Sequence, residues 1–151
     1  MSIEATLAEK GITLPAAPAP AANYVPFVQT GNLIFVSGQI SSNEGGLITG
    51  KLGENMETEA GAEAARRCGL ALIAQLKAAV GDLDRVARVV KLTGFVNSTP
   101  DFTDQPKVIN GCSDLMVEVF GDAGRHARAA VSAPSLPLGV AVEIEAIFEV
   151  K

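Results

Sequence analysis

Apolar and polar residues alternate along residues 142–150, which is the clearest strand pattern in the chain. In an extended backbone, successive side chains point to opposite sides. One side of this run carries Val142, Ile144, Ala146, Phe148 and Val150, and the other carries Glu143, Glu145, Ile147 and Glu149. The pattern predicts a strand with one core-facing side and one mostly acidic side.

A second alternating run precedes it at residues 127–133. One side carries Ala127, Ala129, Val131 and Ala133, and the other carries Arg128, Ala130 and Ser132, preceded by His126. We therefore expect Arg128 to point away from the apolar side. Pro134, Pro137 and Gly139 interrupt regular structure between the two runs. Two strands joined by an irregular connection are predicted.

Three further strand patterns lie upstream. Residues 25–30 and 33–40 have strand-like composition and are separated by Gly31-Asn32, which is typical of a hairpin turn. Pro26 marks the first of them as an edge or late-starting strand. Residues 86–97 form a β-branched run in which Gly94 indicates a position too crowded for a side chain. Residues 41–46 are typical of a polar loop, and residues 47–53 fit either a small strand or irregular structure.

Two helices are predicted between these strands. The first covers residues 58–80, with Thr58 as its N-cap and Gly81 as its end. The second begins with Pro106 in its first turn and ends near Gly121. Apolar residues recur at helical spacing in both, namely Ala65, Cys68, Leu72, Ile73, Leu76, Ala79 and Val80, and then Val108, Cys112, Leu115, Met116 and Val119.

The order β-β-α-β-α-β-β predicts an α+β fold. Both helices have one apolar stripe, which is best buried by placing the two on one face of a largely antiparallel sheet. The opposite face would then carry Arg128, Glu143 and Ile147. In a small domain, self-association around a central axis is the simplest way to cover such a face.

The N-terminus has a different character from the rest. Ser2 is a suitable cap for a short helix through Lys10, ended by Gly11. Pro15, Pro18 and Pro20 then indicate an extended, alanine-rich arm. We predict an N-terminal helix and arm at residues 1–21 and one domain at residues 22–151, because a chain of 151 residues with 48% hydrophobic content fits one core.

Charge and cysteine usage exclude several classes of function. The net charge is −5 and the 12 Lys and Arg residues are scattered, so nucleic acid is a poor partner. A secretory leader and a run of about eighteen apolar residues are both missing, so we expect a soluble cytoplasmic protein that makes no membrane contact. Cys68 and Cys112 fall in predicted helices, and the chain has one histidine and no CxxC. Neither a disulfide framework nor a metal site is predicted.

Several stretches together resemble the YjgF/RidA (Rid) family, formerly called endoribonuclease L-PSP. The resemblance rests on Tyr24, residues 31–40 (GNLIFVSGQI), residues 90–97 (VVKLTGFVN), Arg128, residues 136–139 (LPLG) and residues 142–146 (VEIEA). It covers about residues 22–150. It implies a chorismate-mutase-like fold, a homotrimer with sites between subunits, and hydrolytic deamination of reactive imines or enamines.

The resemblance also assigns roles to individual residues. Arg128 corresponds to the family's carboxylate clamp, since a guanidinium offers a planar fork that matches both carboxylate oxygens; the alternative is a solvated charge or an interface ion pair. Glu143 corresponds to the glutamate near the scissile nitrogen, where it would orient water or relay a proton. Glu145 and Glu149 lie on the same predicted side and are its competitors.

Four more residues are assigned to substrate binding by the same resemblance. Tyr24 would line the site and supply a hydroxyl; the alternative is half-buried packing. Gly38, after Ser37, would admit close approach of the backbone to the substrate; the alternative is a β-bulge. Asn110 aligns with the site less firmly. His126 is interpreted as a rim residue with no required role.

One position departs from the family pattern. Many deaminases of this family have a cysteine two positions after the arginine, where this chain has Ala130. The altered pocket and the N-terminal arm suggest a separate subgroup.

Two functions stay open. The first is hydrolysis of small 2-imino or enamine acids to 2-keto acids and ammonia, for which no cofactor is needed. The second is a non-catalytic trimer that binds a small carboxylate. Ribonuclease activity is disfavoured, because the chain has one histidine, no predicted metal cluster and an acidic net charge.

Overall fold

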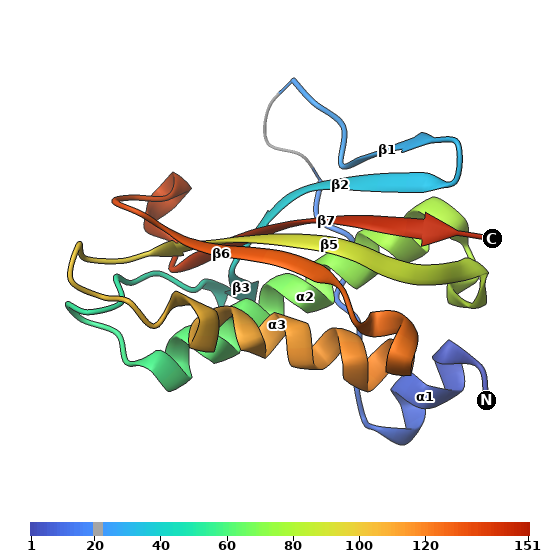
Figure 1. Cartoon of the computed structure of the whole chain (residues 1–151), viewed down its shortest axis with the longest axis horizontal. Coiled ribbons are helices and arrows are strands. Elements are labelled where there is room, and N and C mark those ends of the chain that lie inside the picture. The colour runs from blue at the N-terminus through green and yellow to red at the C-terminus, as the bar shows by residue number, and fades with distance from the viewer. Residues whose placement is uncertain (20–22) are drawn as a thin grey trace.

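The computed structural model describes residues 1–19 and 23–151 and has helices on one side of a five-stranded sheet (Figure 1). The elements are α1 Ile3–Glu9, β1 Phe27–Thr30, β2 Leu33–Ile40, β3 Ser42–Asn43, β4 Gly46–Leu47, α2 Thr58–Val80, β5 Val86–Asn97, α3 Gln105–Phe120, β6 Ala127–Ala133 and β7 Val142–Val150. Short 3-10 turns occur at Leu83–Arg85, Gly121–Gly124 and Pro137–Gly139. The predicted order of strands and helices is confirmed, with the small β3–β4 hairpin added after β2.

The sheet has the order β1-β2-β7-β5-β6. Every pairing in it is antiparallel except β5 with β6, which is parallel. β1 lies at one edge, as Pro26 indicated, and β6 lies at the other. The predicted α+β class and the largely antiparallel sheet are therefore confirmed.

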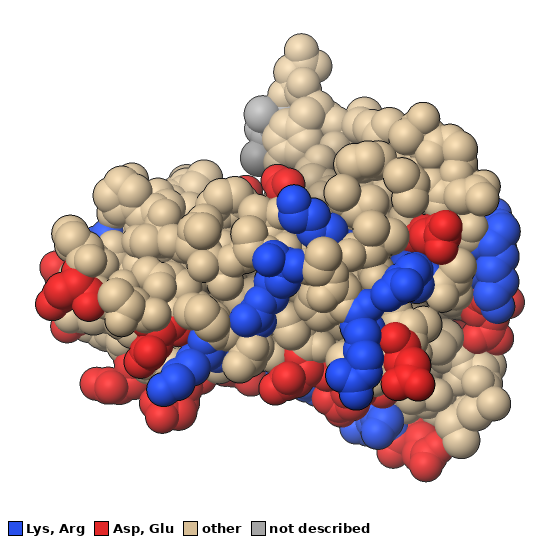
Figure 2. Space-filling view, viewed as in Figure 1, with Lys and Arg blue, Asp and Glu red and all other residues tan. Residues whose placement is uncertain are grey.

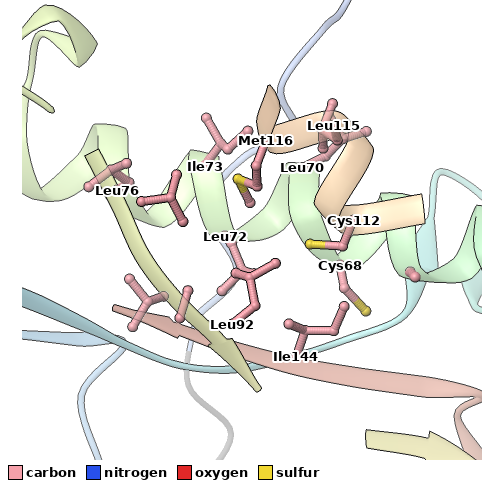
Figure 3. Close-up of a cluster of buried hydrophobic side chains, with 14 of the residues drawn as sticks. Cys68, Leu70, Leu72, Ile73, Leu76, Leu92, Cys112, Leu115, Met116 and Ile144 are labelled. Atoms are coloured by element: carbon pink, nitrogen blue, oxygen red, sulfur yellow. The ribbon is translucent and has the colours of Figure 1, made fainter. Parts of the chain in front are cut away.

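The core lies between the two long helices and the sheet (Figure 3). Leu72 of α2, Leu115 of α3 and Ile144 of β7 are all fully buried there. A Cβ atom at Gly94 would lie 2.5 Å from Ile109 Cδ1, so glycine lets α3 pack directly on β5. Cys68 and Cys112 are buried free thiols in the same cluster, as the helix pattern predicted.

The helix boundaries agree with those predicted from the sequence to within one residue. Ser2 caps α1, since its hydroxyl accepts a hydrogen bond from the Ala5 amide at 3.0 Å. The predicted N-cap at Thr58 is wrong, because Thr58 is already helical and Glu57 is the cap residue. Glu57 makes no side-chain capping bond and glutamate is not a favoured N-cap residue, so the sequence carried no capping signal at the true position.

The N-terminal arm packs against the domain through residues 12–18. Ile12 and Leu14 contact the core, and the Gln75 side chain of α2 donates a hydrogen bond to the Pro18 carbonyl at 2.6 Å. Pro20 and the predicted boundary at residues 21 and 22 lie outside the described residues. No helix in the described ranges is both long and apolar enough to cross a bilayer.

The orientation of β6 differs from the prediction. Arg128 is paired in register with Leu92, and Ala130 with Gly94, both of which face the helices. Paired residues of neighbouring strands point to the same face, so Arg128 and Ala130 lie on the helix side and Val131 lies on the open side. The alternating pattern of β6 was assigned to the wrong faces, because alanine and serine provide little contrast in hydrophobicity.

The open face of the sheet carries exposed apolar side chains among charged ones. Two cross-strand rows follow from the register, one with Val28, Phe35, Ile147 and Lys91, and one with Ile40, Glu143, Phe95 and Val131. Val28 is 52% exposed, Phe35 41% and Val131 44%. Exposed apolar side chains gathered on one face of a sheet are typical of a protein interface.

Candidate functional site

Glu143 lies on the open face, at the centre of the second cross-strand row. It is half-buried, and this burial raises the pKa of its carboxyl, with a smaller contribution from the negative charge of Glu145. No donor or positive group among the described residues opposes that pKa shift. A half-buried carboxylate without a donor is suited to hold water or take up a proton.

A bulge in β2 creates the space for Glu143. The β2–β7 register shifts between Val36 and Gln39, leaving Ser37 and Gly38 without cross-strand partners. A Cβ atom at Gly38 would overlap the Glu143 carboxylate. Gly38 therefore leaves room for the Glu143 side chain, and the approach of its backbone to a substrate stays a prediction.

Ser37 holds the segment that carries Tyr24. Its hydroxyl donates to the Val25 carbonyl at 2.7 Å, and its amide donates to the Pro26 carbonyl at 2.9 Å. Its own carbonyl accepts from the Gln39 side chain at 2.8 Å. Ser37 thus has both donors occupied by the backbone that directly follows Tyr24.

A cavity of about 330 Å³ adjoins Glu143. Tyr24, Gly38 and Glu143 line it together, so the structure brings together three of the six predicted site residues. Tyr24 is 49% exposed. The remaining lining is mostly apolar and includes the connection before β7 and the end of the N-terminal arm.

Arg128 lies elsewhere, on the edge strand β6. Its Nη1 donates to Asn110 Oδ1 at 2.7 Å and to Ser113 Oγ at 3.2 Å, both on α3. No carboxylate of the described residues lies within ion-pair distance of it. Neutral acceptors thus orient the guanidinium and leave its charge uncompensated, which suits it to bind an anion.

Ser113 and His126 continue the hydrogen-bond network that begins at Arg128. Ser113 Oγ lies 2.9 Å from His126 Nε2, and His126 Nδ1 lies 2.6 Å from the Gly124 carbonyl. The sequence indicated Asn110 but not Ser113. Their spacing of three residues places both on one side of α3, and that spacing was the available signal.

Within the chain, Arg128 and Glu143 are separated, which corrects the expectation that they share a face. Arg128 pairs with Leu92, and Leu92 pairs with Ala146, three residues beyond Glu143. Arg128 and Glu143 are thus separated by two strand spacings across the sheet and by three residues along the strand, which is more than about 10 Å. Their side chains also point to opposite faces of the sheet. The two groups therefore lie in separate places on one chain, here called the Arg128 and Glu143 half-sites.

Charged side chains of both signs are interspersed over the lower part of the face in Figure 2, and the upper part is mostly uncharged. This face does not have the continuous basic surface that a nucleic-acid backbone requires. Among the described residues, no three His, Cys, Asp or Glu side chains gather in a way that could hold a metal ion.

Comparisons with known proteins cover nearly the whole chain. The family model described as "YjgF/chorismate_mutase-like, putative endoribonuclease" matches residues 4–149. The chain is 53% identical over 149 residues to Protein TCP17 of Trypanosoma cruzi, covering 97% of this chain and 93% of that protein. It is 30% identical over 143 residues to a 2-iminobutanoate/2-iminopropanoate deaminase of Dermatophagoides farinae, covering 93% of this chain and 95% of that protein. The crystal structure of protein Atu1372 from Agrobacterium tumefaciens is described as of unknown function. It superposes with a TM-score of 0.90 at 47% sequence identity, covering 99% of this chain and 94% of that chain.

Proposed function

The chain belongs to the YjgF/RidA family, and on that premise we propose that it is a homotrimeric hydrolase that converts small 2-imino or enamine acids to 2-keto acids and ammonia. The relative from Dermatophagoides farinae is named for this reaction. The observation that carries the proposal is the Arg128 guanidinium, which is oriented by Asn110 and Ser113 with its charge unpaired within the described chain. A planar cation presented in this way matches a carboxylate.

The two half-sites combine when β6 of one protomer lies against the Glu143 cavity of another. The open face supplies a surface for such an assembly, since Phe35 and Val131 are exposed there on a single chain. Closed cyclic symmetry repeats one contact around the axis. In a trimer, each protomer would therefore contribute Arg128 to one site and Glu143 to the next.

The reaction follows from placing the substrate carboxylate on Arg128 and the C=N carbon beside Glu143. The ionised Glu143 accepts a proton from a water molecule as the water oxygen bonds to the carbon of the protonated imine. Glu143 then returns this proton to the amino nitrogen of the tetrahedral intermediate. The C–N bond breaks and ammonia leaves, and the hydroxyl proton passes to the departing ammonia or to water, which leaves the keto group and, overall, ammonium. The raised pKa of Glu143 brings its two protonation states closer in energy, which favours such a relay.

A non-catalytic carboxylate-binding trimer is the second candidate. Ala130 favours it, because the side chain that follows Arg128 on the same face of β6 is a methyl group with no chemistry. Binding would still use Arg128. Release of ammonia from the substrate separates the two candidates.

In the deciding experiment, an amino-acid oxidase generates the imines in situ from amino acids. The rate of ammonia release is then compared with and without the protein. Hydrolysis above the buffer rate supports the enzyme, and a rate equal to buffer supports the binding protein. The assembly is tested by co-refolding Arg128→Ala with Glu143→Gln chains. Neither variant alone is active, whereas a random mixture of trimers recovers about a quarter of wild-type activity. A mixture that stays inactive, or a monomer in sedimentation, would exclude the shared site.

A further inference from the structure

His126 is connected to Arg128 by a continuous series of hydrogen bonds. His126 Nδ1 lies 2.6 Å from the Gly124 carbonyl oxygen, and His126 Nε2 lies 2.9 Å from Ser113 Oγ. Arg128 Nη1 donates to the same hydroxyl oxygen at 3.2 Å. His126 is the one histidine of the sequence, and the family resemblance gave it no role. The series therefore links a residue of unassigned role to the guanidinium of the first half-site.

The chemistry of the four groups fixes the direction of this series. A carbonyl oxygen only accepts, so His126 Nδ1 carries a hydrogen, and a guanidinium only donates, so Ser113 Oγ accepts from Arg128. The single hydrogen of the serine hydroxyl then points to His126 Nε2, which accepts it when the ring is neutral. Each donor in the series thus has one acceptor, and His126 keeps a lone pair of the Ser113 oxygen directed at Arg128.

The series is anchored on the backbone of one helix. Gly124 ends the 3-10 turn that follows α3, and a Cβ atom at Gly124 would overlap the Met116 carbonyl of α3, so the turn packs directly on that helix. Ser113 lies on the same helix. Without a partner such as His126, a helical serine turns its hydroxyl to the carbonyl of the preceding turn. His126 therefore selects one orientation of the Ser113 hydroxyl.

The consequence at Arg128 is a guanidinium with one free edge. Asn110 and Ser113 take both hydrogens of Nη1. Among the described residues, Arg128 Nε and Nη2 have no hydrogen-bond acceptor. These two nitrogens form a planar edge that binds a carboxylate through two parallel hydrogen bonds. Loss of the Ser113 bond would let the guanidinium turn about its remaining contact with Asn110, and the free edge would lose its direction.

We propose that His126 is a positioning residue for the substrate carboxylate, which acts through Ser113 to fix the Nε–Nη2 edge of Arg128 toward the ligand. The inference rests on the proposed function, because it concerns the carboxylate site of that reaction. Asp114 and Arg125 line the same cavity of about 290 Å³, but neither bonds to His126 or Ser113 among the described residues. Arg125 pairs with Asp122 instead.

Steady-state hydrolysis of a small imino acid tests this role. His126→Leu keeps an apolar side chain in place but removes the acceptor for Ser113. We expect KM to rise about three- to tenfold, the scale of one hydrogen bond, with kcat within about twofold of wild type. His126→Gln keeps an acceptor oxygen of similar reach and returns KM toward the wild-type value. Val117→Ala is the matched control, because Val117 lines the same cavity without a polar side-chain atom, and its KM stays at the wild-type value.

A double-variant cycle separates positioning through Ser113 from a general effect on packing. If His126 acts through Ser113, His126→Leu combined with Ser113→Ala raises KM no further than the more affected single variant. Effects that multiply would show that the two residues act independently and would overturn the proposal.

Nitrogen NMR of the single imidazole, in protein without a histidine tag, gives a readout that does not depend on activity. We expect the neutral ring to carry its hydrogen on Nδ1. Pyruvate, a keto acid with the same carboxylate group, should shift the Nε2 resonance in the wild type but not in Arg128→Ala or Ser113→Ala. A neutral ring with its hydrogen on Nε2 would reverse the series and overturn the proposal.

The outcomes distinguish this inference from the proposed function. If the wild type hydrolyses imines and His126→Leu has the wild-type KM, the positioning role is wrong and the hydrolysis stands. If no imine is hydrolysed, the proposed function fails and the pyruvate experiment decides. A shift of the Nε2 resonance that requires both Arg128 and Ser113 then supports the positioning role. No shift, or a shift that persists in Ser113→Ala, overturns it.

Discussion

Gly38 and Glu143 occupy one small volume at the β2 bulge, since a Cβ atom at Gly38 would overlap the Glu143 carboxylate. The overlapping atoms belong to the end of a flexible side chain, so an added methyl group would displace the carboxylate with little effect on the backbone. Gly38 therefore allows Glu143 to take its position, because the missing side chain leaves that volume free for the carboxylate.

The first prediction follows from this relationship. We expect Gly38→Ala to fold normally and to lose about a hundredfold in kcat/KM, the scale associated with misplacing a reacting group by about 1 Å. The control is a double variant. If Gly38→Ala acts through Glu143, combining it with Glu143→Gln lowers kcat/KM no further than Glu143→Gln alone. Additive losses would show that Gly38 acts independently of Glu143.

The second prediction concerns the geometry of the clamp. Arg128→Lys should fail almost as badly as Arg128→Ala, because lysine keeps the charge but loses the planar fork. Loss of one charge-assisted hydrogen bond costs about 1.5–3 kcal/mol, which corresponds to a decrease of about ten- to a hundredfold in kcat/KM. Steady-state hydrolysis by both variants, with sedimentation to check the trimer, measures this. A lysine variant near wild-type activity would mean that Arg128 acts only as a diffuse charge.

Asn110 provides a third prediction, because it orients Arg128 without neutralising it. Asn110→Asp has nearly the same shape but adds a negative charge beside the guanidinium. We expect it to raise KM more than Asn110→Ala does, since an ion pair with Arg128 competes with the substrate carboxylate. A smaller KM in the aspartate variant than in the alanine variant would indicate that the substrate does not bind at Arg128.

The fourth prediction is a pH dependence. Burial, and then the charge of Glu145, raises the pKa of Glu143. If ionised Glu143 is the base, kcat/KM rises with pH through an inflection above the ordinary glutamate range. Removing the negative charge in Glu145→Gln stabilises the ionised form of Glu143, so the inflection moves to lower pH. The pH–rate profiles of wild type and Glu145→Gln test the sign, and an inflection that moves upward contradicts the assignment.

The fifth prediction concerns the thiols, which are completely buried. Burial raises the pKa of Cys112 to about 12 and also raises that of Cys68. At pH 8, almost no thiolate is present, so both should react slowly with a thiol reagent in the native protein and rapidly after unfolding. Cys112→Ala should retain imine hydrolysis. Loss of activity in an intact Cys112→Ala trimer would show that the mechanism requires a thiol.

The sequence by itself determined the secondary structure and the fold class. The alternation in residues 142–150 and the β-branched run in residues 86–97 matched β7 and β5 to the residue, because the side-chain period is a local property of the backbone. Apolar stripes located both long helices for the same reason. The motif around Arg128 and Glu143 indicated the family without any coordinates.

Only the tertiary structure decided which groups meet. The face of Arg128 depended on the parallel pairing of β6 with β5, because alanine and serine in β6 give no strong preference for either side. The arm's place beside Glu143 depends on the contact between Gln75 and Pro18, which are 57 residues apart. Periodicity describes the surroundings of a residue along its own strand or helix. Contacts between distant segments depend on how the elements pack, and that packing separates Arg128 from Glu143 within the chain.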